Sequence, residues 1–313
     1  MILHEIPAEG RRNDTLVYYM DDMQEIIDIG EYTANLTDSE QRQRRSSLTA
    51  NQKFTGTATM EEAVDLARNG WPEGTRLLKD AADQLEVPPV LGDTVLPEAY
   101  YDVTGSDVDV SRYLSGEPEN MMQYTFPRAP LGNTVELVVE CSQSSSTPTE
   151  TIMRRGAAIL AAVEAMQAQG YSTGVTVAAH VINNARNLEV SHVVPIVKPG
   201  EFVDSDALAF ALAHPSWLRR FVFAASEVAS RRIRERMGYY KGGNYGLPRA
   251  MSIFATNGEY PMVPISATEA GEGGVTAAQK LVDKIAARLE YLRENPMEEI
   301  TPARSKRRDL TSQ

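Results

Sequence analysis

Residues 134–198 carry the pattern that most constrains the fold of this chain. The segment contains, in order, a β-branched run, a small-residue loop, a helix ended by glycine and two further apolar runs: TVELVVE (134–140), CSQSSSTPTE, TIMRRGAAILAAVEAMQAQG (151–170), GVTVAAHVI (174–182) and LEVSHVVPIVK (188–198). Strand, loop, long helix and strand in this order begin a doubly wound α/β sheet. Ligands of such sheets bind beyond the carboxyl ends of the strands, so we expect the stretch from Glu140 to Thr149 to lie at the mouth.

The rest of the chain divides around this core. Further helices are predicted at 57–70, 73–86, 206–238 (with a break near Pro215) and 273–295, and a short strand at 252–256. We expect a polar, irregular N-terminal arm (1–55), a single three-layer α/β domain (56–300) and a disordered basic tail (301–313). Within the domain, 56–130 is predicted to be helical and rich in turns, and 131–300 to hold the core sheet and its helices.

Composition restricts the class of protein. An apolar fraction of 42% and a charged fraction of 24% are typical of soluble globular chains. No segment approaches the roughly 20 apolar residues of a membrane span, and the first residues lack the pattern of a signal peptide. The lone Cys141 cannot form an internal disulfide. We therefore expect a cytoplasmic protein without a membrane partner.

Residues 219–249, the Arg/Tyr segment, oppose the charge of the whole chain. The segment holds eight basic and two acidic residues, a net charge of +6 within a chain of −12. Arginine binds phosphates, tyrosine stacks on bases and glycine keeps a backbone pliable, which together suit single-stranded nucleic acid. The predicted phosphate contacts are Arg231, Arg232, Arg234, Arg236, Lys241 and Arg249, joined by Arg304, Lys306, Arg307 and Arg308 of the tail, and the predicted stacking residues are Tyr239, Tyr240 and Tyr245.

Two other interpretations of this segment stay open. The arginines can line a solvated helix face that leads into a surface loop, and the preference for 24 Arg over 7 Lys can reflect codon usage. A second basic cluster lies at Arg42, Arg44, Arg45 and Lys53. The isoelectric point of about 4.9 argues against a protein that wraps duplex DNA, although it leaves a localised basic patch possible.

The end of the 134–140 strand carries an E-x-S-x-S sequence formed by Glu140, Ser142 and Ser144. It resembles the metal-binding D-x-S-x-S loop of von Willebrand A-type domains, which also begin with strand, loop and helix and continue with two antiparallel strands. The resemblance implies that these three residues could hold a divalent cation. The glutamate departs from the family pattern, and its extra methylene displaces a ligand for which Mg²⁺ tolerates little error. The alternative is a serine-rich turn that caps the following helix.

The remaining reactive side chains form no recognisable catalytic set. His180 and His192 lie on neighbouring predicted strands and could pair across a hairpin, but a metal site needs further ligands, so a hydrogen-bonded structural role is favoured. Nothing in the sequence orients a histidine as a base for Cys141. Neither a P-loop nor a dinucleotide fingerprint is present. We therefore expect a binding protein without enzyme activity or cofactor.

Four stretches resemble proteins encoded by bacteriophages: FTGTATMEEAVDLARNGWPEG (54–74), DVTGSDVDVSRYLSGEPENMM (102–122), RRGAAILAAVEAMQAQGY (154–171) and HPSWLRRFVFAASE (214–227). The resemblance suggests podoviruses that encode their own RNA polymerase, in which a single-stranded-DNA-binding cofactor recruits the polymerase to melted promoters. The resemblance implies a phage transcription or replication factor in the infected host cell. A von Willebrand A-like module that holds a protein partner is the alternative.

Overall fold

The computed structural model describes residues 2–6, 13–82, 98–104, 107–125, 134–168, 171–183, 187–201, 204–237, 247–248, 262–266 and 275–294. The main body contains the following elements, in chain order: β1 (Ile2–Ile6), β2 (Asp14–Tyr19), α1 (Met23–Ala34), α2 (Ser39–Gln43), α3 (Ser46–Thr49), α4 (Gln52–Thr55), α5 (Met60–Asn69), α6 (Pro72–Ala82), β6 (Thr134–Glu140), α8 (Thr149–Ala168), β7 (Ser172–Asn183), β8 (Leu188–Val197), α9 (Ser205–Ala213), the π-helix η3 (Trp217–Val222), α10 (Phe223–Val228), α11 (Arg231–Met237), β9 (Leu247–Pro248), β10 (Met262–Ile265) and α12 (Val275–Glu294).

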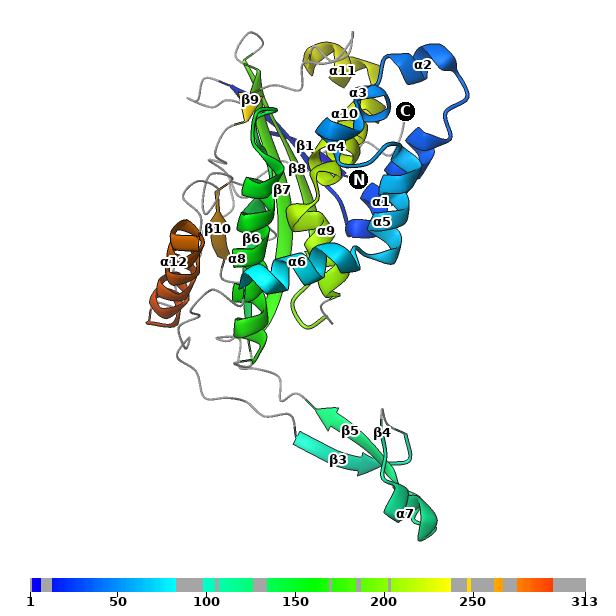
Figure 1. Cartoon of the computed structure of the whole chain (residues 1–313), viewed down its shortest axis with the longest axis vertical. Helices are drawn as coiled ribbons and strands as arrows, with labels where there is room; N and C mark the ends of the chain where they lie inside the picture. The colour runs from blue at the N-terminus through cyan, green and yellow to red at the C-terminus, as the bar shows by residue number, and fades with distance from the viewer. Residues whose placement is uncertain are drawn as a thin grey trace.

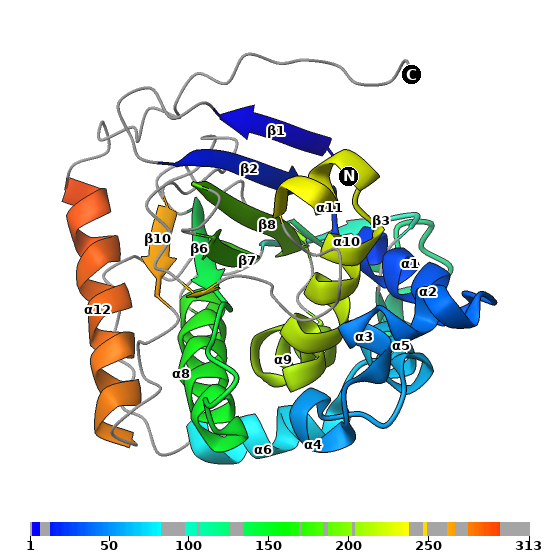
Figure 2. The ribbon, with the colours of Figure 1, turned by 90° about the horizontal axis from the view of Figure 1, so that it is seen from above.

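A central sheet organises the main body. Its strand order is β1-β2-β8-β7-β6-β10, and β9 pairs with β7 (Figure 2). β6 is parallel to both β7 and β10, and β2 is parallel to β8, whereas β7 and β8 form an antiparallel pair. The mixed α/β class with a mostly parallel sheet flanked by helices is therefore confirmed, as is the expected order of strand, loop, helix and two antiparallel strands.

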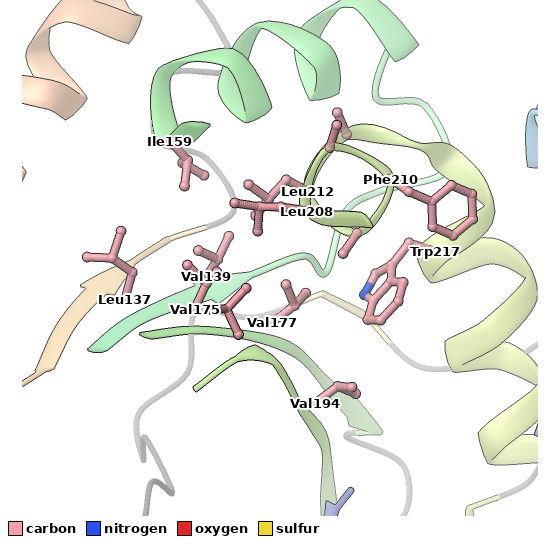
Figure 3. Close-up of a cluster of buried hydrophobic side chains, with 14 of the residues drawn as sticks. Leu137, Val139, Ile159, Val175, Val177, Val194, Leu208, Phe210, Leu212 and Trp217 are labelled. Carbon is pink, nitrogen blue, oxygen red and sulfur yellow. The ribbon is translucent and has the colours of Figure 1, made fainter. Parts of the chain in front are cut away.

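The main core lies between the sheet and α8 and α9. Figure 3 shows Ile159 of α8 and Leu208 and Leu212 of α9 against the valines of the sheet. Alternate residues of β6, such as Leu137 and Val139, join this core because successive side chains of a strand point to opposite faces. The helices α1, α5, α6, α10 and α12 contribute to the same core cluster. On the other face of the sheet lies a smaller cluster formed by Val17, Val138, Ala178, Val193 and Met262.

The N-terminal region is part of the fold, so the predicted irregular arm at 1–55 is wrong. β2 lies between β1 and β8 in the central sheet, and Leu16 and Ile26 are fully buried. Asp22 caps α1 by accepting a hydrogen bond from the backbone N–H of Glu25. The sequence pattern hid β2 because a strand buried on both faces does not alternate between polar and apolar residues.

Several helix predictions are confirmed. α5 begins after the Thr59 cap and ends at Gly70, whose φ of 83° suits glycine. α8, β7, β8 and α12 each lie within two residues of their predicted ranges. The segment predicted as one broken helix at 206–238 is divided into α9, η3, α10 and α11, with the first break at Pro215 as expected. The predicted strand at 252–256 and the tail at 301–313 lie outside the described residues.

Residues 98–125, called the extension below, form a second small sheet. It consists of β3 (Glu98–Asp102), β4 (Asp107–Val108), α7 (Val110–Leu114) and β5 (Met121–Thr125), with the antiparallel order β3-β5-β4. Figure 1 shows the extension projecting away from the main body, at the end opposite α11. The single domain predicted for 56–300 must be amended, since this part does not join the central sheet.

Candidate functional site

The helix α11 holds the described part of the predicted nucleic-acid contacts. Ile233 and Met237, four residues apart, are buried with side chains of β2 and β8. This contact fixes the orientation of the helix. Arg231 and Arg232 are consequently exposed, and Arg234 is half-buried.

The four arginines of α11 differ in their ion-pair partners. Arg231 pairs with Glu235 one turn later, at 2.8 Å from Nε to Oε1, and its side chain remains 74% exposed. Arg236 donates to the Asp14 carboxylate and lies 3.7 Å from that of Glu5, so it ties α11 to β1 and β2. No carboxylate of the described residues forms an ion pair with Arg232 or Arg234. These two guanidinium groups, with exposed Arg231, are the cations that α11 can offer to a ligand.

The first two arginines of the Arg/Tyr segment do not belong to a surface patch. Arg220 is fully buried and donates to Thr57 Oγ1 at 2.6 Å, the Ser47 carbonyl at 2.6 Å, Thr55 Oγ1 at 3.1 Å and the Thr57 carbonyl at 2.7 Å. Arg219 donates to the Phe54 carbonyl at 2.8 Å and its guanidinium lies over the Phe54 ring, 4.3 Å from the ring centre. The expectation of one continuous basic segment from 219 to 249 is wrong, because these two guanidinium groups cross-link η3 to the N-terminal helices.

The remaining predicted contacts of this segment and of the tail lie outside the described residues: Tyr239, Tyr240, Lys241, Tyr245, Arg249, Arg304, Lys306, Arg307 and Arg308. The two segments that flank residues 238–246 in the sequence belong to the described residues. The Asn183 side chain at the end of β7 donates to the Met237 carbonyl of α11 at 2.9 Å, and Leu247 of β9 pairs with Ile182 of β7. Both flanks are therefore held at the same end of β7, and Leu247 is 62% exposed there.

The second basic cluster of the sequence is dispersed. Arg44 pairs with Glu40 at 3.5 Å, and Arg42 lies 3.7 Å from Glu61. Arg45 is 8% exposed. This region therefore presents fewer available cations than its sequence indicates.

The E-x-S-x-S loop directs its predicted ligands to different places. Glu140 and Ser142 are both 2% exposed, and Ser142 Oγ accepts a hydrogen bond from the backbone N–H of His180. Ser144 is exposed, with its hydroxyl 2.9 Å from that of Ser146. Among the described residues, no group of three or more histidine, cysteine, aspartate or glutamate side chains could hold a metal ion. The loop instead receives a protein cation, since Arg219 lies 3.4 Å from the Ser144 carbonyl.

A small pocket lies beside this loop. Its volume of about 20 Å³ has room for roughly one water molecule, far less than the space a small-molecule substrate requires. Burial raises the pKa of the Cys141 thiol to about 12 and lowers the pKa of His214 to about 4. A protonated thiol is a poor nucleophile, so Cys141 is unsuited to covalent catalysis. The lining also includes Arg155, Trp217 and Arg219.

Sequence reasoning missed a buried polar network on the other face of the sheet. His180 Nδ1 lies 2.7 Å from Ser191 Oγ, and His180 Nε2 lies 3.5 Å from Glu189. Asn13 donates to the same carboxylate at 3.0 Å. A serine, a histidine and an acid in contact suggest a catalytic triad, but Ser191 is only 3% exposed, so its hydroxyl cannot meet a substrate in this state. The polar residues at 189 and 191 in the strand were the available signal.

His192 lies on the helix-covered face. Its ring stacks on Tyr18 at 5.0 Å between ring centres, and Nε2 lies 3.2 Å from Ser226 Oγ. Burial lowers its pKa to about 4. In the register of β7 and β8, His192 pairs with Ala179 and His180 pairs with Ser191, so the two histidines point to opposite faces. They do not pair across the hairpin, and each has the hydrogen-bonded structural role expected.

Among the helices that the structure describes, none combines the length and the apolar character needed to cross a membrane.

Comparison with known proteins identifies the family of the chain. Neither the curated proteins nor the solved structures include a match. Residues 5–291 match the family described as a domain of unknown function, DUF7192. Because this match spans far more than half of the sequence, the chain belongs to the DUF7192 family.

Proposed function

We propose that the protein binds single-stranded DNA, without catalysis, through α11 and the tyrosine- and glycine-rich sequence that follows it. The observation that carries this proposal concerns the ion pairing of Arg232 and Arg234. Two guanidinium groups without an ion pair among the described residues lie on one helix of a chain with a net charge of −12. Such a local positive field attracts phosphates even when the protein as a whole is acidic.

Arg231 strengthens this surface. Its partner Glu235 is also exposed, and an exposed pair of this kind contributes little to stability. A phosphate group can therefore replace Glu235 as the partner of Arg231 at small cost. Arg236, by contrast, anchors the helix to β1 and β2, and we assign it a positioning role rather than a phosphate contact.

The biological setting belongs to the same proposal. The resemblance of residues 54–74 and 214–227 to bacteriophage proteins supports a phage transcription or replication factor that acts in the cytoplasm of an infected bacterium. In that setting the protein would hold the melted strand and recruit a phage RNA polymerase. The high pKa of Cys141 and the burial of Ser191 support a role in binding rather than in catalysis.

The proposal is tested by the fluorescence anisotropy of a labelled oligothymidine at several salt concentrations. In the double variant Arg232→Gln/Arg234→Gln, we expect weaker binding and a salt slope reduced by about 1.4, since each phosphate contact contributes about 0.7 on single strands. Duplex DNA should bind the parent protein less tightly, because stacking requires exposed base faces.

The matched control removes the same charge elsewhere. Arg44, the C-cap residue of α2, and Arg76 of α6 are exposed, so Arg44→Gln/Arg76→Gln lowers the net charge equally. It should leave affinity and slope close to those of the parent. Equal losses in both double variants would show that binding depends on total charge alone, and no binding by the parent would refute the proposal.

A von Willebrand A-like interaction module is the second candidate. The observation that favours it is the order β6, loop, α8 and the antiparallel pair β7 and β8. A cation at the Glu140 loop would raise the melting temperature with Mg²⁺ or Mn²⁺ by mass action, and Glu140→Gln would abolish that rise. We expect neither ion to stabilise the parent, because Glu140 and Ser142 are buried and Arg219 contacts the loop.

A further inference from the structure

The extension exposes several large apolar side chains. Its exposed large side chains are Tyr100, Tyr101, Val103, Val108, Val110, Tyr113 and Leu114, with exposures that range from 39% for Tyr101 to 78% for Leu114. None of the side chains described within residues 98–125 is buried. An apolar concentration of this kind on a soluble protein marks a surface that binds another molecule.

The following contacts among the described residues of the extension are too weak to replace a core. Tyr101 donates to Asp109 at 2.9 Å, and the Arg112 guanidinium lies over the Tyr101 ring at 3.9 Å while pairing with Glu117 at 2.6 Å. These contacts are solvent-exposed or half-exposed, where ion pairs and cation–π contacts contribute little to stability. A small antiparallel sheet needs a buried apolar face for stability, so a covering surface must supply it.

The net charge of the extension indicates which kind of surface would bind it. The extension contains six acidic residues and one arginine, a net charge of −5. Two extensions would repel each other if their faces met, whereas a basic surface would be complementary. Because Arg236 is paired with Asp14 and Glu5, the helix α11 offers three arginines against one glutamate. It lies beside the 62% exposed Leu247 of β9. This surface, called the α11–β9 surface, offers both charge and an apolar contact.

The extension and the α11–β9 surface lie at opposite ends of the molecule (Figure 1). The nearest matching surface for the extension is therefore that of another molecule. We propose that the extension binds the α11–β9 surface of a second copy of this chain, and that the second copy returns the same contact. Reciprocal docking closes a two-fold dimer, whose two identical interfaces bury both extensions and leave neither surface open to further chains.

Sedimentation velocity of the full chain, freed of nucleic acid and studied from about 1 to about 100 µM, tests this dimer. The parent should form dimers that weaken as salt increases, since charged interfaces are screened. Two variants remove one side of the contact each: Tyr113→Ser/Leu114→Ser on the extension and Arg232→Glu/Arg234→Glu on α11. Each alone should dimerise at least about tenfold more weakly than the parent.

Mixing the two variants gives the sharpest result. The intact extension of the α11 variant fits the intact α11 of the extension variant, so the mixture should recover a dimer with one of the two contacts. Tyr32→Ser, which removes another exposed tyrosine at α1, is the matched control and should dimerise like the parent. A monomeric parent at about 100 µM, a dimer unaffected by Tyr113→Ser/Leu114→Ser, or a mixture that stays monomeric would overturn the proposal. Failure here leaves the DNA-binding measurement unaffected, because that test uses a different ligand.

Discussion

At the scale of single residues, neighbouring arginines in this chain have opposite roles. Arg220 is fully buried and donates hydrogen bonds to backbone and hydroxyl oxygens of residues 47–57, whereas Arg232 is exposed. Lysine keeps the charge of arginine but loses the planar fork that serves these acceptors. Arg220→Lys should lower the free energy of unfolding by about 2–4 kcal/mol, and Arg232→Lys by less than about 0.5 kcal/mol. Urea denaturation of both variants measures the two free energies of unfolding. Similar losses would contradict a stabilising role for the buried hydrogen bonds of Arg220.

Two buried histidines predict how stability depends on pH. His192 and His214 have pKa values lowered to about 4 by burial, against an ordinary value of 6.5. The unfolded chain therefore binds protons below pH 6.5 while the native state does not. Their contribution to stability is complete above pH 6.5 and decreases as the pH falls towards 4. The loss is at most about 3–4 kcal/mol for each histidine.

Urea denaturation at several pH values checks the predicted loss of stability between pH 6.5 and 4. In the variant His192→Gln/His214→Gln, the free energy of unfolding should be lower at pH 7, and its decline between pH 6.5 and 4 should be shallower. The ring of His214 also packs against aromatic rings, with distances between ring centres of 4.8 Å to Trp71 and 4.9 Å to Phe210. Part of the loss of stability at pH 7 therefore comes from packing. An unchanged slope in the variant would assign the acid sensitivity to other groups.

At the scale of elements, α8 and α9 approach closely at Gly156. A Cβ atom added there would lie 2.7 Å from the Cβ of Ala213 and 3.4 Å from its Cα. Glycine to alanine inside a helix ordinarily stabilises by about 0.5–1 kcal/mol. Gly156→Ala should instead destabilise the protein by about 1–3 kcal/mol, because the helix pair must separate. The sign of the change in unfolding free energy therefore decides whether this helix contact is as tight as the structure shows.

The elements that the sequence predicted best are long and strongly patterned. β6, α8, β7 and β8 were recognisable because β-branched runs, helical spacing and a glycine end gave consistent signals. β2 was missed, since its six residues are buried on both faces and lie in polar surroundings. No pattern of spacing reveals a parallel pairing with β8, which comes from residues far away in the chain.

The candidate site was predictable only in part, for a physical reason. An arginine on a helix is equally compatible with solvent, an ion pair or a buried cluster, and only tertiary packing selects among them. Arg219 and Arg220 are buried because residues 47–57 present carbonyl and hydroxyl oxygens to them, while Arg236 is engaged by carboxylates of β1 and β2. Composition predicted a basic surface, and the fold reduced its described part to Arg231, Arg232 and Arg234.

At the scale of the whole molecule, charge is separated between two ends. The extension has a net charge of −5, and the three arginines that α11 offers lie at the opposite end of the longest axis (Figure 1). If both proposals hold, a DNA phosphate backbone and the extension of a second copy compete for the same arginines. Binding at shared groups is mutually exclusive, so each ligand weakens the binding of the other by the same factor.

This competition gives the last prediction. Adding unlabelled oligothymidine to the parent under dimeric conditions should convert it to monomer–oligonucleotide complexes, as sedimentation velocity would show. The variant Tyr113→Ser/Leu114→Ser keeps all arginines of α11 but lacks the competing apolar contact, so at micromolar protein its apparent affinity for the oligonucleotide should exceed that of the parent. At nanomolar protein, where the parent is monomeric, the two affinities should converge, because mass action has already removed the competitor. A dimer that binds the oligonucleotide without dissociating would place DNA and the extension on separate surfaces.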